Sequence, residues 1–237
     1  MKKIGTFLLR IVFAVLVCIS GFLLLKSPIN IVVENVPAMA KAIVQKNVDH
    51  SDNIDLKNTL KLGEELGVTD KIWGQLQRKY QYNLSYTNLY NLSVSYQENG
   101  ELTDKNLNLT EKNQIQKAFN YVIIDRINHN LKHNSQSVKQ KINMFHYFFF
   151  GVIAVFAITA LLILLGKKIA SLLLLLSAGA TFGLQQFYVN ELLQYLQTEF
   201  YHGITLSTSA ALWLGLGLAL VIIVLWPLVL KITAKNN

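Results

Sequence analysis

Residues 148–188 read "FFFGVIAVFAITALLILLGKKIASLLLLLSAGATFGLQQFY" and contain two apolar runs, 148–165 and 169–188, separated by three residues. Each run is close to the roughly 20 residues that a helix needs to cross a hydrocarbon core about 30 Å thick. Three residues allow only a tight turn, so the two runs predict an antiparallel helical hairpin. Lys167 and Lys168 in the turn favour the cytoplasmic side, because cytoplasmic loops are enriched in Lys and Arg.

Two further apolar runs, residues 7–25 and 210–230, bring the expected membrane crossings to four. The composition agrees, because 52% of the 237 residues are hydrophobic, 15% are charged and the mean hydropathy is +0.33. An ordinary soluble domain of this length is less apolar. We therefore expect a membrane protein with four transmembrane α-helices and a mixed α+β extracytoplasmic domain between the first and second helices.

Charge predicts the orientation of this layout. The basic residues that flank the apolar runs, with no acidic residue among them, are Lys2, Lys3, Arg10, Lys167, Lys168, Lys231 and Lys235. By the positive-inside rule, both termini and the hairpin turn are expected in the cytoplasm and residues 27–147 outside the cell membrane. The first run resembles a secretory signal, but the A-x-A-like site at residues 38–40 lies well beyond it, so we expect an uncleaved anchor.

The expected domains are an N-terminal anchor over residues 1–26, an extracytoplasmic α+β domain over 27–147 and a three-helix membrane bundle over 148–237. Within the bundle, residues 189–206 follow the third run on its outer side. The apolar residues that recur there at helical spacing are Val189, Leu192, Leu193, Leu196 and Phe200. This spacing predicts an outer amphipathic loop at residues 189–206 that contains a helix lying on the membrane or under the exported domain.

The exported segment contains three helical patterns. One covers residues 55–66 and stops at Gly67, and a second starts at Thr69 and runs to Tyr80. A third begins after Thr110 and carries a long apolar stripe along one side. Residues 134–137, Asn-Ser-Gln-Ser, are the expected break before the second membrane crossing.

Residues 80–96 read "YQYNLSYTNLYNLSVSY", with an aromatic or aliphatic residue at every even position except Asn88. Strict alternation predicts β-strands, and Asn99-Gly100 is typical of a hairpin turn. We expect a small antiparallel sheet whose even-numbered side chains pack on the helices. The odd-numbered ones, including Ser93 and Ser95, are expected to face water.

The tyrosines of this stretch allow a second interpretation. Tyr82, Tyr86, Tyr90 and Tyr96 are the candidate ligand-binding residues if they are exposed as a ladder. Tyrosine combines a large apolar ring with a hydrogen-bonding hydroxyl, which suits contact with a glycan or a peptide. The pattern alone does not separate this interpretation from a buried face.

Few residues suggest chemistry. His129 and His133 lie four positions apart on a predicted helix, a spacing at which two imidazoles can bind a transition metal, but no third ligand follows. We interpret the pair as a solvated face, with a metal site as the weaker alternative. Motifs for a nucleophile or a phosphate loop do not occur, so no catalytic residue and no cofactor is expected. Gln185 and Gln186 are expected to hydrogen-bond between helices.

Small residues suit close helix packing in the last two runs. Gly179 and Gly183 have the spacing at which two helix backbones can approach closely, and Gly215 and Gly217 offer a similar surface on the fourth run. We interpret these glycines as helix-packing positions within one bundle. A homodimer face is the alternative, which leaves a homo-oligomer open.

One anchor, a large exported domain and three further spans form a gross layout that resembles the FtsX-like permeases of ABC systems. The short inner hairpin departs from that pattern, since a permease must meet its ATPase with substantial cytoplasmic elements. We therefore favour a non-enzymatic envelope protein whose exported domain binds a partner protein, peptide or envelope component, as an accessory subunit of a transporter or signalling system. A membrane-embedded enzyme or permease subunit is the alternative.

The partners follow from composition and charge. The lipid bilayer is one, and a protein of the envelope is expected as another. A nucleic acid is not expected despite the net charge of +8, because the basic residues flank the apolar runs. The exported segment is rich in Lys, Asn and Gln, which we regard as typical of a bacterial protein, so the glycosylation patterns at Asn83, Asn91 and Asn108 are not expected to be used.

The orientation is testable with single cysteines in a Cys18→Ser background. Ser51→Cys and Asn99→Cys should react with an impermeant thiol reagent on intact cells, because both residues are expected outside. Lys167→Cys should react only after the cells are opened. Labelling of Lys167→Cys alone on intact cells would invert the orientation.

Overall fold

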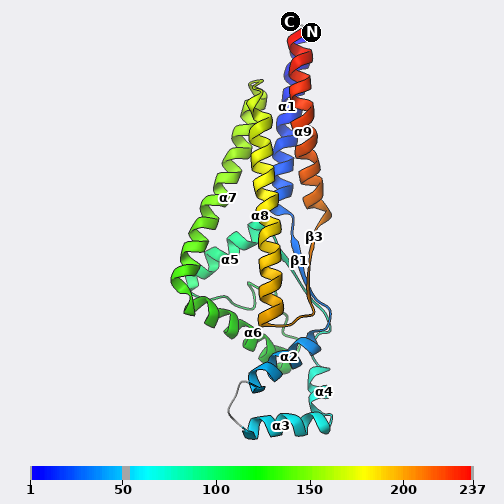
Figure 1. The fold of residues 1–237 in the computed structure, drawn as a ribbon, viewed down its shortest axis with the longest axis vertical. Helices are drawn as coiled ribbons and strands as arrows, with labels where there is room; N and C mark the ends of the chain where they lie inside the picture. The colour runs from blue at the N-terminus through cyan, green and yellow to red at the C-terminus, as the bar shows by residue number, and fades with distance from the viewer. Residues whose placement is uncertain (1, 50–53, 236–237) are drawn as a thin grey trace.

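Four long apolar helices form one end of the molecule, and a small sheet with shorter helices forms the other (Figure 1). The structure, a computed structural model, describes residues 2–49 and 54–235. Within this part of the chain, the helices long and apolar enough to cross a membrane are α1 (Lys2–Lys26), α7 (Ser135–Leu164), α8 (Ile169–Glu199) and α9 (Ala210–Lys235). We call these four helices the bundle. They are compatible with the integral membrane protein that the sequence predicts.

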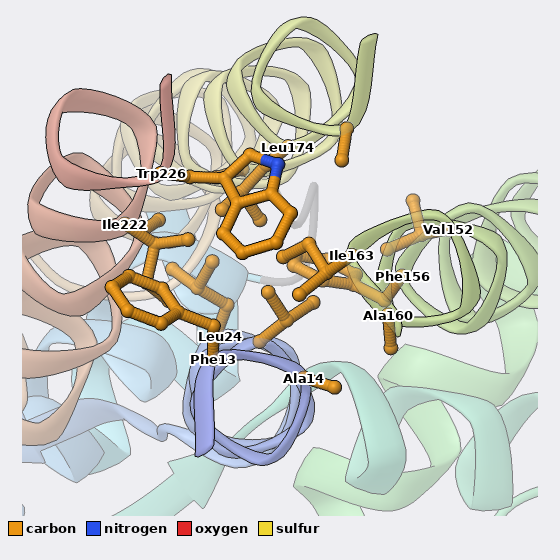
Figure 2. Packing of buried hydrophobic residues seen from close by; sticks show 14 of the residues in the cluster. Phe13, Ala14, Leu24, Val152, Phe156, Ala160, Ile163, Leu174, Ile222 and Trp226 are labelled. Atoms are coloured by element: carbon orange, nitrogen blue, oxygen red, sulfur yellow. The ribbon is translucent and has the colours of Figure 1, made fainter. Parts of the chain in front are cut away.

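Helix α1 packs against all three other bundle helices. Figure 2 shows side chains from the four helices gathered into one core, including Phe13 of α1, Ile163 of α7, Leu174 of α8 and Trp226 of α9. The rings of Phe13 and Trp226 lie 5.6 Å apart, and Trp226 is completely buried. Large apolar side chains also cover the outside of the bundle, so the helices are apolar both toward one another and away from one another.

The turn between α7 and α8 is held by side chains from α1 and α9. Nε1 of Trp226 donates a hydrogen bond to the Lys167 carbonyl at 3.0 Å, and Nη1 of Arg10 donates to the Leu164 carbonyl at 3.3 Å. Gly166 has a φ of 69°, a left-handed conformation that glycine adopts without steric cost. A Cβ atom at this position would also lie only 2.7 Å from the Arg10 guanidinium. The predicted hairpin is thus confirmed.

A three-stranded antiparallel sheet, made of β1 (Ile29–Val33), β2 (Tyr80–Leu84) and β3 (Ile204–Thr208), continues from the bundle in the described part of the chain. β1 follows directly after α1, and β3 directly precedes α9. The order is β2-β1-β3, and Ile31 in the central strand lies opposite both Tyr82 and Leu206. Sequence patterns did not predict β1 or β3.

The head region, as we call it, consists of this sheet, five shorter helices and the far end of α8. These helices are α2 (Val36–Asp49), α3 (Ile54–Glu65), α4 (Val68–Trp73), α5 (Tyr86–Asn99) and α6 (Gln114–His133). The helices predicted over residues 55–66 and after Thr110 are confirmed, and Asn134 separates α6 from α7 as expected. Helix α4 is shorter than predicted because the chain leaves the helix at Gly74.

The hairpin predicted for residues 80–96 is wrong beyond the first five residues. Residues 86–99 form helix α5, because the Ser85 side chain accepts a hydrogen bond from the Asn88 amide and caps the helix N-terminus. Gly100, with a φ of 72°, ends the helix instead of forming a hairpin turn. Ser93, expected to face water, is buried as a result.

The amphipathic helix predicted within the outer loop at residues 189–206 is helical as far as Glu199, but it is not a separate element. Helix α8 continues without interruption to Glu199, well past the apolar run, and carries the end of its apolar face into the head region. The chain then turns at residues 201–203 and forms β3. The helical spacing of the apolar residues from Val189 to Leu196 is thus confirmed, and they belong to α8.

The role of Trp226 can be measured against a second tryptophan of the same helix. Trp226→Phe should lower the free energy of unfolding by about 1–3 kcal/mol, because it leaves the Lys167 carbonyl without its donor. Trp213, which is 55% exposed, provides the control, and Trp213→Phe should change stability by no more than about 0.5 kcal/mol. Thermal unfolding of the full chain in detergent compares the two. Equal losses would show that the hydrogen bond to the turn is not what stabilises this end of the bundle.

Candidate functional site

The head region contains a half-open apolar cavity of about 230 Å³. Its walls come from all three strands, from α2, α5 and α6, from the loop after α5, and from the part of α8 that extends beyond the bundle. The apolar side chains that line it include Ile31, Tyr80, Tyr82, Leu84, Leu89, Leu92, Leu107, Phe119, Ile123, Ile127, Leu192, Leu196 and Phe200. The polar lining residues are Gln77, Gln116 and Asn120. No lining side chain carries a charge at neutral pH.

Tyr80 and Tyr82 form the sheet side of the cavity. They are two residues apart on β2, so both rings lie on the same face of the strand. The Tyr80 hydroxyl donates to the Leu107 carbonyl at 2.7 Å, and the Tyr82 hydroxyl donates to the Asn106 carbonyl at 3.1 Å. Two tyrosines thus hold the loop after α5 against the cavity.

Both phenols remain neutral in this setting. Burial raises the pKa of Tyr80 and of Tyr82 above the ordinary value, and the proximity of Tyr82 raises the pKa of Tyr80 further. A raised pKa keeps the proton on the oxygen throughout the physiological range. The tyrosines therefore act as hydrogen-bond donors to the loop and as apolar walls for the cavity.

The buried amides of α6 bond to one another and to the backbone. The backbone N–H of Gln77 donates to Oε1 of Gln116 at 3.0 Å. Nε2 of Gln116 donates to Oδ1 of Asn120 at 2.9 Å, and Nδ2 of Asn120 donates to the Thr110 carbonyl at 3.0 Å. Gln116 and Asn120 are each only 1% exposed. Among the described residues, none of the buried side-chain polar atoms that lack a partner belongs to the cavity lining. The cavity surface is therefore apolar, and the buried polar side chains that line it already have hydrogen-bond partners.

Helix α5 separates the cavity from the bundle. Leu89 and Leu92 face the cavity, whereas Tyr86 and Tyr90 pack against the bundle core. The Tyr86 hydroxyl donates to the Thr181 carbonyl of α8 at 2.8 Å, and the ring of Tyr90 stacks on Phe149 of α7 at 5.2 Å. Leu89 is 36% exposed, the largest value among the lining residues, and marks the rim of the cavity.

The four tyrosines proposed as a ladder do not share one surface. Tyr82 lines the cavity, Tyr86 and Tyr90 contact the bundle, and Tyr96 is buried near the end of α5. Because residues 86–96 are helical, period-two spacing distributes these rings around the axis. Tyr82 alone of the four contributes to the cavity.

Other candidate residues lie away from the cavity. His129 and His133 are exposed on α6 with their rings 6.4 Å apart, and the described part of the chain contains no group of three His, Cys, Asp or Glu side chains that could hold a metal. Gln185 is 3% exposed, yet neither atom of its amide has a hydrogen-bond partner among the described residues. The interhelical bond expected for Gln185 is thus not formed.

The glycines of the last two spans differ in their surroundings. Gly215 lies against α1, where an added Cβ would approach Leu23 to 3.0 Å, and its carbonyl accepts a hydrogen bond from Ser20 at 2.8 Å. At Gly179, Gly183 and Gly217, an added Cβ would meet no side chain or neighbouring helix within 4 Å. A packing role for these three would need a molecule outside this chain.

Sequence patterns gave partial signals for the cavity. The apolar stripe of α6 and the spacing of Leu192, Leu196 and Phe200 were both visible, and both line the cavity. The sequence does not show that these segments line one cavity, because the lining residues are far apart along the chain. Ile31 and Ile204, for example, are separated by 173 positions. Loop residues such as Leu107 carried no periodic signal at all.

Comparison of the chain with protein families, with curated proteins and with solved structures found no match. The function is therefore inferred from the geometry. The relevant features are an apolar cavity, a rim at Leu89 and a wall, α5, that the head region shares with the bundle.

The amide wall of the cavity is testable by substitution. Gln116→Leu should lower the free energy of unfolding by about 1–3 kcal/mol, because the Gln77 amide and the Asn120 side chain lose their buried partner. Gln114 is exposed on the first turn of the same helix, so Gln114→Leu is a matched control with an expected change within about 0.5 kcal/mol. Chemical denaturation of the full chain would compare them. If Gln116→Leu left the free energy of unfolding unchanged, the amide network would not contribute to the stability of the head region.

Proposed function

We propose that the chain is a multi-pass protein of the cell membrane whose head region lies outside the cell and binds an envelope component without catalysing a reaction. The observation that carries this proposal is the apolar cavity of the head region. Protein interiors are close-packed, with few voids larger than a water molecule, so a lined space of about 230 Å³ with an exposed rim is better suited to an occupant than to emptiness. Apolar pockets with a few convergent polar groups are typical of binding sites.

Charge and surface support the proposed orientation. The start of α1, the end of α9 and the α7–α8 turn lie at the end of the bundle opposite the head region (Figure 1). Lys167 and Lys168 are in that turn, and Lys231 is in the last turns of α9. The outward side chains Phe7, Phe150 and Val224 are between 53% and 62% exposed, an arrangement that suits contact with lipid.

The lining of the cavity favours binding over catalysis. Proton transfer needs a side chain that changes its protonation near neutral pH, and nucleophilic chemistry needs an activated hydroxyl, thiol or amine. The titratable lining side chains are Tyr80 and Tyr82, and both are neutral and bonded to backbone carbonyls. The cavity therefore offers shape and apolar surface.

The proposal can be tested in cells by photocrosslinking from the rim. The full chain would carry the photoreactive amino acid p-benzoylphenylalanine at Leu89 or, as a matched control, at Asn91, which is exposed on the same helix. We expect a discrete adduct from position 89 and none from position 91, because side chains two positions apart on a helix point to different sides.

Filling the cavity provides the second control for this experiment. Ile123→Trp, which adds a large ring to the lining, should abolish the adduct from position 89. Val122→Trp should not, because Val122 is 42% exposed and does not line the cavity. The same yield of adduct from positions 89 and 91 would contradict a binding role for the cavity.

A further inference from the structure

We propose that the occupant of the head cavity is the aliphatic chain of a membrane lipid, received from the leaflet beside α5. This inference rests on the proposed function and specifies the ligand of the same site. Three observations carry it: the chemistry of the cavity wall, the volume of the cavity and the position of its rim along the bundle.

The chemistry of the wall favours an apolar occupant over a polar one. A peptide backbone brings an N–H and a carbonyl group with every residue, and each needs a partner when it is removed from water. The buried amides of Gln116 and Asn120 already bond to one another and to the backbone, and the hydroxyls of Tyr80 and Tyr82 bond to loop carbonyls. An occupant without polar atoms matches this wall, and a hydrocarbon chain is such an occupant.

The volume matches a segment of such a chain. A space of about 230 Å³ corresponds to roughly seven or eight groups the size of a water molecule, at about 30 Å³ each. A methylene group has a similar size. The cavity therefore accommodates the terminal part of an acyl chain, while the rest of the lipid remains outside the rim.

The depth of α5 places the rim beside the bilayer. Thr181, which bonds to Tyr86 of α5, is twelve positions after the start of α8 at Ile169, or about 18 Å along a helix. Phe149, which stacks on Tyr90, is fifteen positions before the end of α7 at Leu164, or about 22 Å. Both distances are measured from the helix ends at the α7–α8 turn, and both are shorter than the roughly 30 Å thickness of a hydrocarbon core.

Helix α5 begins between α7 and α8 (Figure 1). With the α7–α8 turn at the inner surface of the core, these distances put the start of α5 in the outer half of the bilayer. Leu89 follows Tyr86 by one turn and is the exposed residue of the lining. Leu192 and Leu196 extend the cavity along α8 to positions about 34 and 40 Å from Ile169, beyond the core. A chain end that enters beside Leu89 would reach Leu192 and Leu196 through the cavity.

The test uses the purified full chain in nanodiscs of phosphatidylglycerol that contain an analogue with a diazirine at the end of one acyl chain. After illumination, mass spectrometry would map the label to peptides. We expect label on α6 around Ile123 and on α8 around Leu196, in addition to the bundle. Label on these head segments requires entry of the chain end, because α6 lies in the head region and not in the bundle.

Matched variants make the result specific. Ile123→Trp should remove the label from the head segments and leave the label on α1 and α9 unchanged, which also reports that the bundle is intact. Leu196→Trp, from α8, should have the same effect, and Val122→Trp should have none. Label restricted to the bundle of the unaltered chain would overturn the lipid inference.

The cellular crosslink from position 89 separates the two proposals. An adduct with the mass of a protein, together with an unlabelled head region in nanodiscs, would overturn the lipid as ligand and leave the proposed binding role standing. Loss of both signals would overturn both. An adduct with the mass of a lipid in cells and label on α6 in nanodiscs would support both.

Discussion

Burial of α1 by its three neighbours underlies the rest of the architecture. Val17 and Leu24 of α1 are completely buried, as is Trp226 of α9. Helix α1 also supplies Arg10, whose guanidinium donates a hydrogen bond to the Leu164 carbonyl at the α7–α8 turn. The helices of the bundle satisfy their backbone groups internally, which is compatible with a hydrocarbon environment. The chain leaves α1 after residue 26 and becomes the central strand of the sheet, so one segment lies at the centre of both halves of the molecule.

Helix α5 connects the two halves mechanically. Its bundle side is aromatic, with Tyr86 and Tyr90 packed against α7 and α8, and its head side is aliphatic, with Leu89 and Leu92 on the cavity. Aromatic rings with a polar tip suit the boundary between hydrocarbon and water, because each ring buries apolar area while its hydroxyl finds a partner. A change of spacing between α7 and α8 would therefore reach the cavity through this helix.

The elements that the sequence predicted well are those whose signals are long. Four apolar runs of about 20 residues, the two lysines of the turn and the stripe of α6 each left little room for another structure. The alternation over residues 80–96 misled because Tyr86 and Tyr90 also fit a helical face, and the cap at Ser85 favoured the helix. β1 and β3 were missed because each has five residues and adjoins or closely follows a stronger helical pattern.

The cavity was beyond prediction for a different reason. It forms only because the fold brings together residues on β1, on α6 and on the far end of α8. A local sequence pattern cannot predict such contacts between distant segments. Gln116 and Asn120 read as ordinary polar positions in a helix, yet they are among the most buried side chains of the head region. A buried amide needs hydrogen-bond partners, and here two of them lie outside α6: the backbone N–H of Gln77 donates to Gln116, and the Thr110 carbonyl accepts from Asn120.

The strand order has a consequence for biosynthesis. β1 pairs with β3, and the partners Val33 and Ile204 are separated by 171 positions. At about 5–20 residues per second, a ribosome needs roughly 10–35 s to supply the second strand after the first. During that interval one edge of the central strand has no partner within its own chain, and exposed strand edges invite pairing with other chains. Completion of the sheet thus waits until β3 has been synthesised.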